Sequence, residues 1–231
     1  MSIHYNAAQQ SVHLTGGILR HFRVFSTPEQ NPALGVLSTP THPQVTQTVS
    51  LLQTYNAFGS QHKVLGETLL EIREYHSSDE AACLMIMQSN IPEYFRENDL
   101  TDFSGFLKNL PGPFFVVTDS NSDVIACGGI AFGITTSTEA ILCYGMVVHT
   151  HLYQGIGLQL LKKRLDYFLP LAPQVERILV NTTQKTEGFF RKFGFSIVER
   201  ELNGFGTGLD HVSMMAAKDD VLRLLNRRKQ N

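Results

Sequence analysis

The sequence predicts a mixed α/β fold, in which a mostly antiparallel sheet is flanked by helices on both faces. Two features indicate this fold. Two β-rich segments, 114–117 and 124–132, are joined by the turn residues 119–123, as in an antiparallel hairpin. A helical pattern separates the apolar segment 140–148 from the next one, 177–180, as in a strand–helix–strand crossover. One sheet that contains both connections must combine antiparallel and parallel pairing.

The elements around these two connections follow from local patterns. A strand is predicted over 68–75, and Ser77 with Glu80 has the spacing of a capping box for a helix that runs to about residue 90. A second helical region, 93–110, is expected to break near Asn98. The later elements are, in order, a helix over 155–168, a helix over 183–192 ended by Gly194, strands over 195–202 and 211–217, and a helix over 219–228.

The ordered domain is expected to span residues 67–231, because residues 1–66 have a different composition. The first 66 residues are rich in Gln, Thr, Ser and Asn and contain few charged residues. Their histidines are scattered without the spacing of metal ligands. We therefore expect a loosely structured N-terminal extension, with a short helix near 45–57.

Composition excludes several classes of function. The chain has 231 residues, 42% of them hydrophobic, which is enough for one packed domain. Its formal net charge of -2 argues against nucleic acid as the main partner. The sequence has no signal peptide and no apolar run of about 18 residues, so we expect a cytoplasmic protein with no membrane span. Cys83, Cys127 and Cys143 lie far apart in apolar segments, so we expect buried free thiols, no metal site and no nucleophilic cysteine.

Two glycines lie at the start of the helix in the crossover, in the motif Gln154-Gly-Ile-Gly157. The N-terminus of a helix carries unpaired N–H groups and partial positive charge, which favour a phosphate group. Glycine also allows the backbone to approach a ligand closely. Two glycines before a helix are, however, more often only a tight turn, so the motif alone leaves both interpretations open.

A second motif, Lys192-x-Gly194-Phe195, follows one strand and one helix later. Together with Val147-Val148 and Gln154-Gly-Ile-Gly157, it makes the segment from about Glu67 to Ala217 resemble the Gcn5-related N-acetyltransferase (GNAT) family. The resemblance implies a GNAT-like fold and acetyl-CoA as co-substrate. The acyl acceptor that it implies is a primary amine of a small molecule or a peptide. A homodimer is compatible with the resemblance.

The resemblance also implies which residues bind the cofactor, in a gap between the strands that end near Val148 and Val180. These residues are Met146, Val147, Val148, Gln154, Gly155, Ile156, Gly157, Leu158, Gln159, Thr183 and Phe190. Thr183 and Phe190 depart from the family pattern, which often has asparagine and tyrosine there. Phe190 has no proton to give to a departing thiolate. The acceptor wall is expected from residues 90–110 and 203–210.

An amine must be neutral to attack the thioester, but a free lysine amine has a pKa near ~10.4 and is therefore protonated at neutral pH. We therefore expect a base, or a chain of water molecules that leads to one, to remove the proton. The interior of the predicted strand 141–148 contains no carboxylate. The catalytic candidates on this strand are Tyr144, which period two places on one face with Leu142 and Ala140, and Glu139 at its start. For Tyr144, a ring that fills the core is the alternative interpretation.

His149 and His151 follow the strand at a spacing of two, so they could form a ligand pair, supply a base or be plain loop histidines, and loop histidines are the favoured interpretation. Glu93 could contact a substrate amine, although a solvated surface charge is the favoured interpretation. Two functions therefore remain open. The first is an acetyltransferase that moves an acetyl group to a primary amine by direct attack in a ternary complex. The second is a non-catalytic module that binds acyl-CoA.

Overall fold

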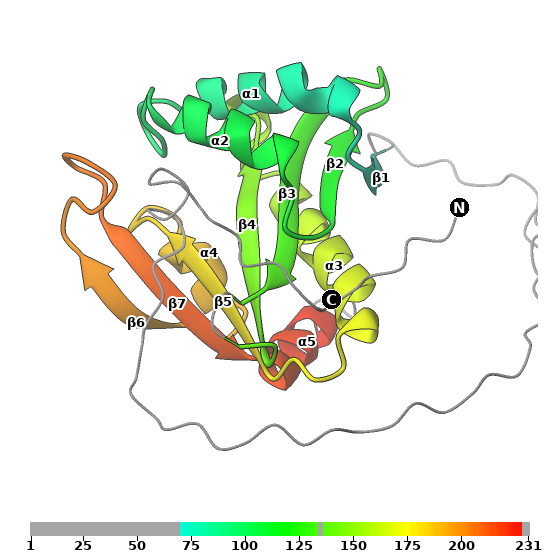
Figure 1. The fold of residues 1–231 in the computed structure, drawn as a ribbon, viewed down its shortest axis with the longest axis vertical. Coiled ribbons are helices and arrows are strands. Elements are labelled where there is room, and N and C mark those ends of the chain that lie inside the picture. The colour runs from blue at the N-terminus through cyan, green and yellow to red at the C-terminus, as the bar shows by residue number, and fades with distance from the viewer. Residues whose placement is uncertain (1–69, 134–135, 228–231) are drawn as a thin grey trace, which may run out of the picture. The chain divides into compact units, whose positions relative to one another are not determined.

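The computed structural model of the protein describes residues 70–133 and 136–227. The expectations for residues 1–66 fall outside these ranges. The described residues form one mixed sheet with helices on both faces, as predicted (Figure 1).

The sheet has seven strands in the order β1-β2-β3-β4-β5-β7-β6. All neighbouring pairs are antiparallel except β4 and β5, which are parallel. The strands are β1 (Glu71–Glu74), β2 (Phe114–Thr118), β3 (Val124–Phe132), β4 (Glu139–Val147), β5 (Arg177–Thr182), β6 (Ser196–Glu201) and β7 (His211–Ala217). The single parallel pair is the one that the crossover predicted.

Within the described ranges, five α-helices cover the sheet: α1 (Glu80–Ser89), α2 (Asp99–Lys108), α3 (Ile156–Phe168), α4 (Glu187–Arg191) and α5 (Lys218–Arg227). Helices α1 and α2 pack on one face of β2, β3 and β4, through a buried cluster that includes Phe103 and Cys143. Helices α3 and α5 pack on the other face, where Leu165 and Leu225 share a cluster with β5 and β7. Figure 1 shows α3 crossing behind β3 and β4, opposite α1 and α2.

The start of the first helical segment differs from the prediction. The carboxylate of Asp79, not of Glu80, accepts a hydrogen bond from a backbone amide that precedes the segment, that of His76 (2.9 Å). Glu80 instead accepts a hydrogen bond from the Ser104 hydroxyl (2.8 Å) on α2. The expected Ser77–Glu80 capping box is therefore wrong, because residues 77–79 form a 3-10 turn whose carboxylate is Asp79.

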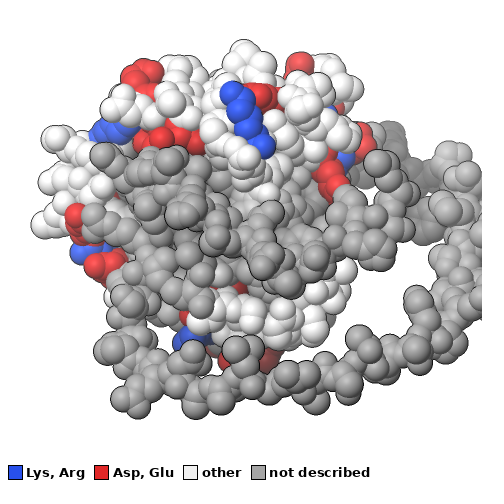
Figure 2. Space-filling model, in the orientation of Figure 1, with Lys and Arg blue, Asp and Glu red and all other residues white. Residues whose placement is uncertain are grey.

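Charged side chains are mixed in sign on the described surface. Figure 2 shows Lys and Arg interspersed with Asp and Glu on the visible face, without a continuous patch of either sign among the described residues. None of the helices in the described ranges has the length and apolar character needed to cross a membrane.

Candidate active site

The site lies where β4 and β5 diverge. The two strands pair in parallel only from Glu139–Arg177 to Leu142–Val180. Beyond these pairs β4 continues to Val147, and β3 is the one described strand that pairs with it there. The edge of β4 that faces β5 is therefore open over its last residues, which leaves backbone groups for a ligand.

A β-bulge interrupts β4 at this point. Cys143 pairs with Gly129 and Met146 with Cys127, so Tyr144 and Gly145 together stand opposite Gly128. Tyr144 adopts a φ of 43°, in the left-handed region that a tyrosine rarely occupies. A conformation of this kind costs free energy and is often found at functional sites.

The bulge changes the face of the sheet to which Tyr144 points. Its ring lies 4.7 Å from that of Phe103 and 4.6 Å from that of Phe106, between ring centroids, on the face covered by α2. Leu142, in contrast, belongs to the cluster on the opposite face. The expectation that Tyr144 shares a face with Leu142 and Ala140 is wrong, because the extra residue of the bulge breaks the alternation.

A cavity of about 730 Å³ opens between the diverging strands. Its lining residues come mainly from four parts of the chain, with Phe205 added from the β6–β7 loop. The four parts are the end of β4 (Ile141–Val147), the start of α3 (Gly155–Leu158), the end of β5 with α4 (for example Thr183 and Phe190), and the α1–α2 connection (for example Asn90 and Tyr94). The cavity is large enough for a cofactor-sized ligand.

The N-terminus of α3 offers backbone donors to this cavity. Gly155 precedes the helix with a φ of 81°, which favours glycine. The amides of Leu158 and Gln159 both donate to the Gly155 carbonyl, at 3.1 and 3.2 Å. Among the described residues, no backbone acceptor engages the amides of Ile156 and Gly157. These two donors suit a phosphate oxygen.

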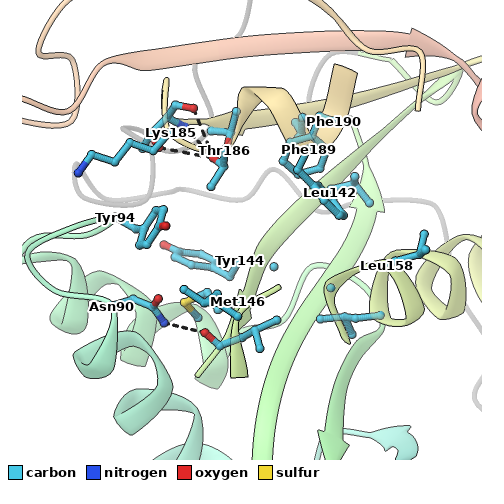
Figure 3. A pocket seen from close by; sticks show the side chains of 18 of the residues that line it. Asn90, Tyr94, Leu142, Tyr144, Met146, Leu158, Lys185, Thr186, Phe189 and Phe190 are labelled. Atoms are coloured by element: carbon cyan, nitrogen blue, oxygen red, sulfur yellow. Dashed lines mark hydrogen bonds between the residues drawn. The ribbon is translucent and has the colours of Figure 1, made fainter. Parts of the chain in front are cut away.

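An aromatic wall faces this terminus across the cavity. Figure 3 shows the ring of Tyr144 extending from β4 toward Tyr94, and Phe189 and Phe190 of α4 pointing toward Leu142. The Lys185 ammonium lies 5.9 Å from the centre of the Tyr94 ring, within range of a cation–π contact. The wall thus combines apolar rings with a small number of polar groups.

Two long-range contacts hold the α1–α2 connection against the rest of the cavity wall. The buried Asn90 donates from its side-chain amide to the Val147 carbonyl (2.9 Å) and so ties the end of α1 to β4. The Arg96 guanidinium donates to the carbonyls of Pro92 (2.8 Å) and Thr207. Arg96 therefore links the α1–α2 connection to the β6–β7 loop, whose Phe205 lines the cavity.

Burial raises the pKa of two tyrosines that line the cavity, Tyr144 and Tyr94. Burial first, and then the negative charges of Asp102 and Asp99, raise the pKa of Tyr144 well above its ordinary value. Burial and a hydrogen bond with Tyr153 raise the pKa of Tyr94 in the same direction. Both hydroxyls are therefore protonated at neutral pH, so they can donate a proton or a hydrogen bond but are poorly suited to act as bases.

Most of the predicted site residues are found around this cavity. The predicted residues that line it are Tyr144, Met146, Val147, Gly155, Ile156, Gly157, Leu158, Thr183 and Phe190. The side chains of Val148, Gln154 and Gln159 are not among its lining. The amide of Val148 donates to the Ile125 carbonyl (2.8 Å), so it is already engaged by β3.

Glu139 does not reach the site. It lies at the opposite end of β4, buried, with its carboxylate 2.8 Å from the Arg177 guanidinium. The cavity begins two residues later, at Ile141. This position does not fit the catalytic role expected for Glu139, because the strand carries it away from the divergence of β4 and β5.

Sequence reasoning did not single out several lining residues. Asn90 and Tyr94 fall within the segment 90–110 expected for the acceptor wall, but no local pattern distinguished them from their neighbours. Lys185 and Thr186 lie between β5 and α4, where the position of the chain depends on tertiary packing. Arg164 is different, because it follows Leu160 and Leu161 at helical spacing within the apolar stripe of α3. A single cation in an otherwise apolar helix face is a pattern that could have indicated a functional role for Arg164 from the sequence.

Comparisons with known proteins agree with this geometry. A family model described as an acetyltransferase (GNAT) domain matches residues 101–218, just over half of the 231-residue chain. A search of curated protein sequences finds no significant match.

Several solved structures have a similar fold. A GCN5-related N-acetyltransferase from Kribbella flavida is similar at 15% identity with a TM-score of 0.54, over 64% of this chain and 97% of that one. The ribosomal-protein-S18-alanine N-acetyltransferase from Escherichia coli is similar at 17% identity with a TM-score of 0.53, over 64% of this chain and 94% of that one. An aminoglycoside 6'-N-acetyltransferase complexed with coenzyme A is similar at 13% identity with a TM-score of 0.52, over 64% and 97%.

At identities this low, the likeness to solved structures establishes only the fold. The match to the family model establishes the family. The divergence of β4 and β5, the glycines at the start of α3 and the matched domain agree with each other. The chain belongs to the GNAT acetyltransferase family.

Proposed function

We propose that the protein transfers the acetyl group of acetyl-CoA to a primary amine, by direct attack of the amine within a ternary complex. One observation carries this proposal. A single cavity extends from the N-terminus of α3, past the open edge of β4, to the aromatic wall and the α1–α2 connection. A donor and an acceptor that enter from its two ends would meet at the bulge.

The cofactor would bind at the α3 end. The backbone of Gln154–Gln159 supplies donors for the diphosphate, and the backbone of Met146–Val148 runs beside the pantetheine arm, with Thr183 and Phe190 on the far side. Gly157 supports this assignment. A Cβ at Gly157 would lie 3.8 Å from the nearest described atom, an ordinary contact, so packing does not explain the glycine. Glycine inside a helix costs about 1 kcal/mol relative to alanine, and room for a ligand accounts for that cost.

The thioester oxygen needs a hydrogen-bond donor as negative charge develops on it. Successive amides of a strand point to opposite edges, and the Val148 amide points to β3. The Val147 amide therefore points to the open edge, and we assign it as one donor. We assign the protonated Tyr144 hydroxyl as a second donor, in place of the base that its position first suggested.

The amine would approach along the aromatic wall. Asp99 and the rings of Tyr94 and Tyr144 line this part of the cavity, and carboxylates and ring faces both attract an ammonium group. Four carboxylates in or near the segments 90–110 and 203–210 could attract a cationic acceptor, namely those of Glu93, Asp99, Asp102 and Asp210. Asp99 alone of these is in the lining, while Asp210 is paired with Arg200 (3.1 Å). A small molecule and a peptide N-terminus or lysine both fit these groups.

Calorimetric titration with acetyl-CoA and a thiol-release assay with a panel of amines test the proposal together. We expect acetyl-CoA to bind in the micromolar range and at least one amine to accelerate thiol release. Binding without turnover for any amine would favour a non-catalytic acyl-CoA-binding module. The absence of binding at high micromolar concentration would contradict both functions.

A further inference from the structure

Arg164 is a buried cation on the apolar face of α3. Its neighbours along that face, Leu160, Leu161 and Leu165, are at most 1% exposed, and Arg164 itself is only 3% exposed. Arginine is rarely buried to this extent unless it is paired. Arg164 also lines the cavity between β4 and β5, so it is buried by protein but reaches the site.

No carboxylate within residues 70–133 and 136–227 forms an ion pair with Arg164. Its Nε donates to the Leu160 carbonyl and its Nη1 to the Gly129 carbonyl, both at 3.3 Å. No acceptor in the same described ranges engages Nη2. The titratable groups close enough to act on the guanidinium are the thiols of Cys127 on β3 and Cys143 on β4, which belong to the cluster on the opposite face of the sheet.

These two thiols do not neutralise the cation. Burial raises the pKa of Cys143 to about 12 and that of Cys127 well above its ordinary value, so both thiols are uncharged at neutral pH. Burial lowers the pKa of Arg164 to about 10, which still leaves it charged. The protein thus keeps a positive charge beside its cavity without a negative partner among the described residues. Such a charge is costly unless a ligand compensates it.

Two glycines make room for the guanidinium beneath the bulge. A Cβ at Gly145 would lie 3.0 Å from Nη1 and 3.1 Å from Nη2, and a Cβ at Gly128 would lie 3.2 Å from Nη1. Both distances at Gly145 are shorter than most real Cβ contacts, so any side chain there would push the guanidinium away. The guanidinium therefore lies directly against the β4 backbone next to Met146, where the thioester is proposed to lie.

The proposed reaction generates an anion at this place. The amine nitrogen forms a bond to the carbonyl carbon, the carbon–sulfur bond then breaks, and its electron pair stays on sulfur as the CoA thiolate. The nitrogen loses one proton to solvent or a base. Because the diphosphate would bind at the start of α3, the sulfur would reach the bulge from the α3 face, the face on which Arg164 lies. Tyr144 lies on the opposite face, toward α2.

We propose that the Arg164 guanidinium stabilises the thiolate of CoA as it leaves, through Nη2 at the base of the bulge. This inference rests on the proposed function and names a group for a step that the apolar Phe190 cannot assist. A fixed cation in a water-poor cavity lowers the energy of a nearby anion without needing to transfer a proton.

The test measures the pKa of the CoA thiol in the binary complex, from the ultraviolet absorbance of the thiolate across a pH series. In the wild type we expect the bound thiol to ionise at least about one pH unit below free CoA, a tenfold shift of the equilibrium. Arg164→Met should return the thiol pKa to the free value, and Arg164→Lys should retain most of the shift. Leu161→Met, on the same helix but outside the cavity lining, should leave it unchanged.

A bound thiol that ionises like free CoA in the wild type would overturn the inference, as would an unchanged shift in Arg164→Met. Slower turnover of Arg164→Met with an unchanged thiol pKa would also overturn it, because the arginine would then act at another step. Circular dichroism and thermal unfolding establish that each variant folds. If Arg164→Met does not fold, Gly145→Ala takes its place, because its Cβ would displace the guanidinium and should also return the thiol pKa toward the free value. An unchanged shift in Gly145→Ala would overturn the inference.

The wild-type measurement compares CoA with desulfo-CoA, which lacks the thiol. If the bound thiol has a lowered pKa, the affinity for CoA should rise with pH between the bound and the free pKa, up to about tenfold per unit of difference, whereas the affinity for desulfo-CoA should not. Equal pH dependence of the two would overturn the inference. Desulfo-CoA that does not bind at all would instead contradict the proposed function, so the two failures can be distinguished.

Discussion

The side-chain amide of Asn90 donates a hydrogen bond to the Val147 carbonyl, 2.9 Å away, although 57 residues separate the two in the chain. The dashed line that starts at Asn90 in Figure 3 marks this bond. The same amide donates a second hydrogen bond to the Ile86 carbonyl at 2.8 Å. Asn90 is 4% exposed, so both bonds are shielded from water. One side chain thus fixes the end of α1 against the strand proposed to hold the cofactor.

Asn90→Asp should lower the free energy of unfolding by about 1–3 kcal/mol, measured by urea denaturation. A carboxylate cannot donate to the two carbonyls, and buried groups that lose their partners cost this much. Asn109→Ala is the matched control, because Asn109 also donates to the carbonyl four residues before it (3.3 Å) but on the exposed surface. We expect a change below about 0.5 kcal/mol for the control. Equal losses in the two variants would contradict a bridging role for Asn90.

Gly157→Glu should abolish acetyl-CoA binding and preserve the fold. The nearest described atoms to a Cβ at this position are Val147 Cγ2 (3.8 Å) and the Phe189 ring (4.0 Å), so the helix accepts a side chain. A carboxylate there would stand beside the amides proposed to bind the diphosphate and would repel it. Calorimetry should show at least about a 100-fold loss of affinity, equivalent to roughly 2.8 kcal/mol. Unchanged affinity would place the diphosphate elsewhere.

Tyr144→Phe should reduce kcat by about 100-fold, the typical loss when one oxyanion donor is removed, with little change in acetyl-CoA affinity. The ring contacts with Phe103 and Phe106 do not involve the hydroxyl, so the fold should remain intact. Because the pKa of Tyr144 is raised in the folded state, its ionisation should produce no limb in the pH–rate profile near neutrality. Full activity of Tyr144→Phe would make the ring a packing element only.

The raised pKa of Tyr144 also predicts a loss of stability in alkali. The unfolded tyrosine ionises near pH ~10, whereas the folded one still holds its proton there. The contribution of Tyr144 to the free energy of unfolding is therefore complete below that pH and is lost as the pH rises further. Tyr144→Phe should show a smaller decline in unfolding free energy above pH ~10 than the wild type.

Local patterns predicted most of the fold. The strand over 211–217 has the predicted bounds, and the helix of the crossover begins at Ile156, next to the glycine that the motif indicated. Turn residues 119–123 form a turn in which the Asp119 carboxylate accepts hydrogen bonds from the amides of Asn121 and Asp123, both at 2.9 Å. These elements were predictable because alternation, helical period and turn chemistry all act within a few residues.

The parts that sequence could not supply depend on contacts between distant segments. The bulge at Tyr144 exists only through the register of β4 against β3, so the alternation rule placed the ring on the wrong face. Helix α4 begins at Glu187 and not near Thr183, because the Thr183 carbonyl accepts from the amides of Thr186 and Glu187 (both 3.1 Å) in a turn before the helix. The burial of Arg164 required both the bulge and two glycines on different strands.

Asp79 fixes β1 to the start of the first helical segment, and its charge should contribute to stability. Arg73 donates two hydrogen bonds to its carboxylate, at 2.7 and 2.8 Å, and the His76 amide donates a third at 2.9 Å. Asp79→Asn should lower the free energy of unfolding at neutral pH by about 1.5–3 kcal/mol, the range for hydrogen bonds to charged groups. Asp220→Asn, which breaks an exposed pair with Arg223 (2.7 Å), should cost less than about 1 kcal/mol.

The pH dependence gives the sign of this contribution. The hydrogen bonds from Arg73, opposed by burial, hold the pKa of Asp79 below its ordinary value in the folded state. Because the pKa of Asp79 is lower in the folded state, its contribution to the free energy of unfolding is complete above the unfolded pKa of about 3.9. This contribution is lost as the pH falls through the folded pKa. The gap in unfolding free energy between the wild type and Asp79→Asn should therefore be constant from pH ~5 to neutrality and shrink in more acidic solution. A gap that stays the same below pH ~3 would show that shape, and not charge, makes Asp79 important.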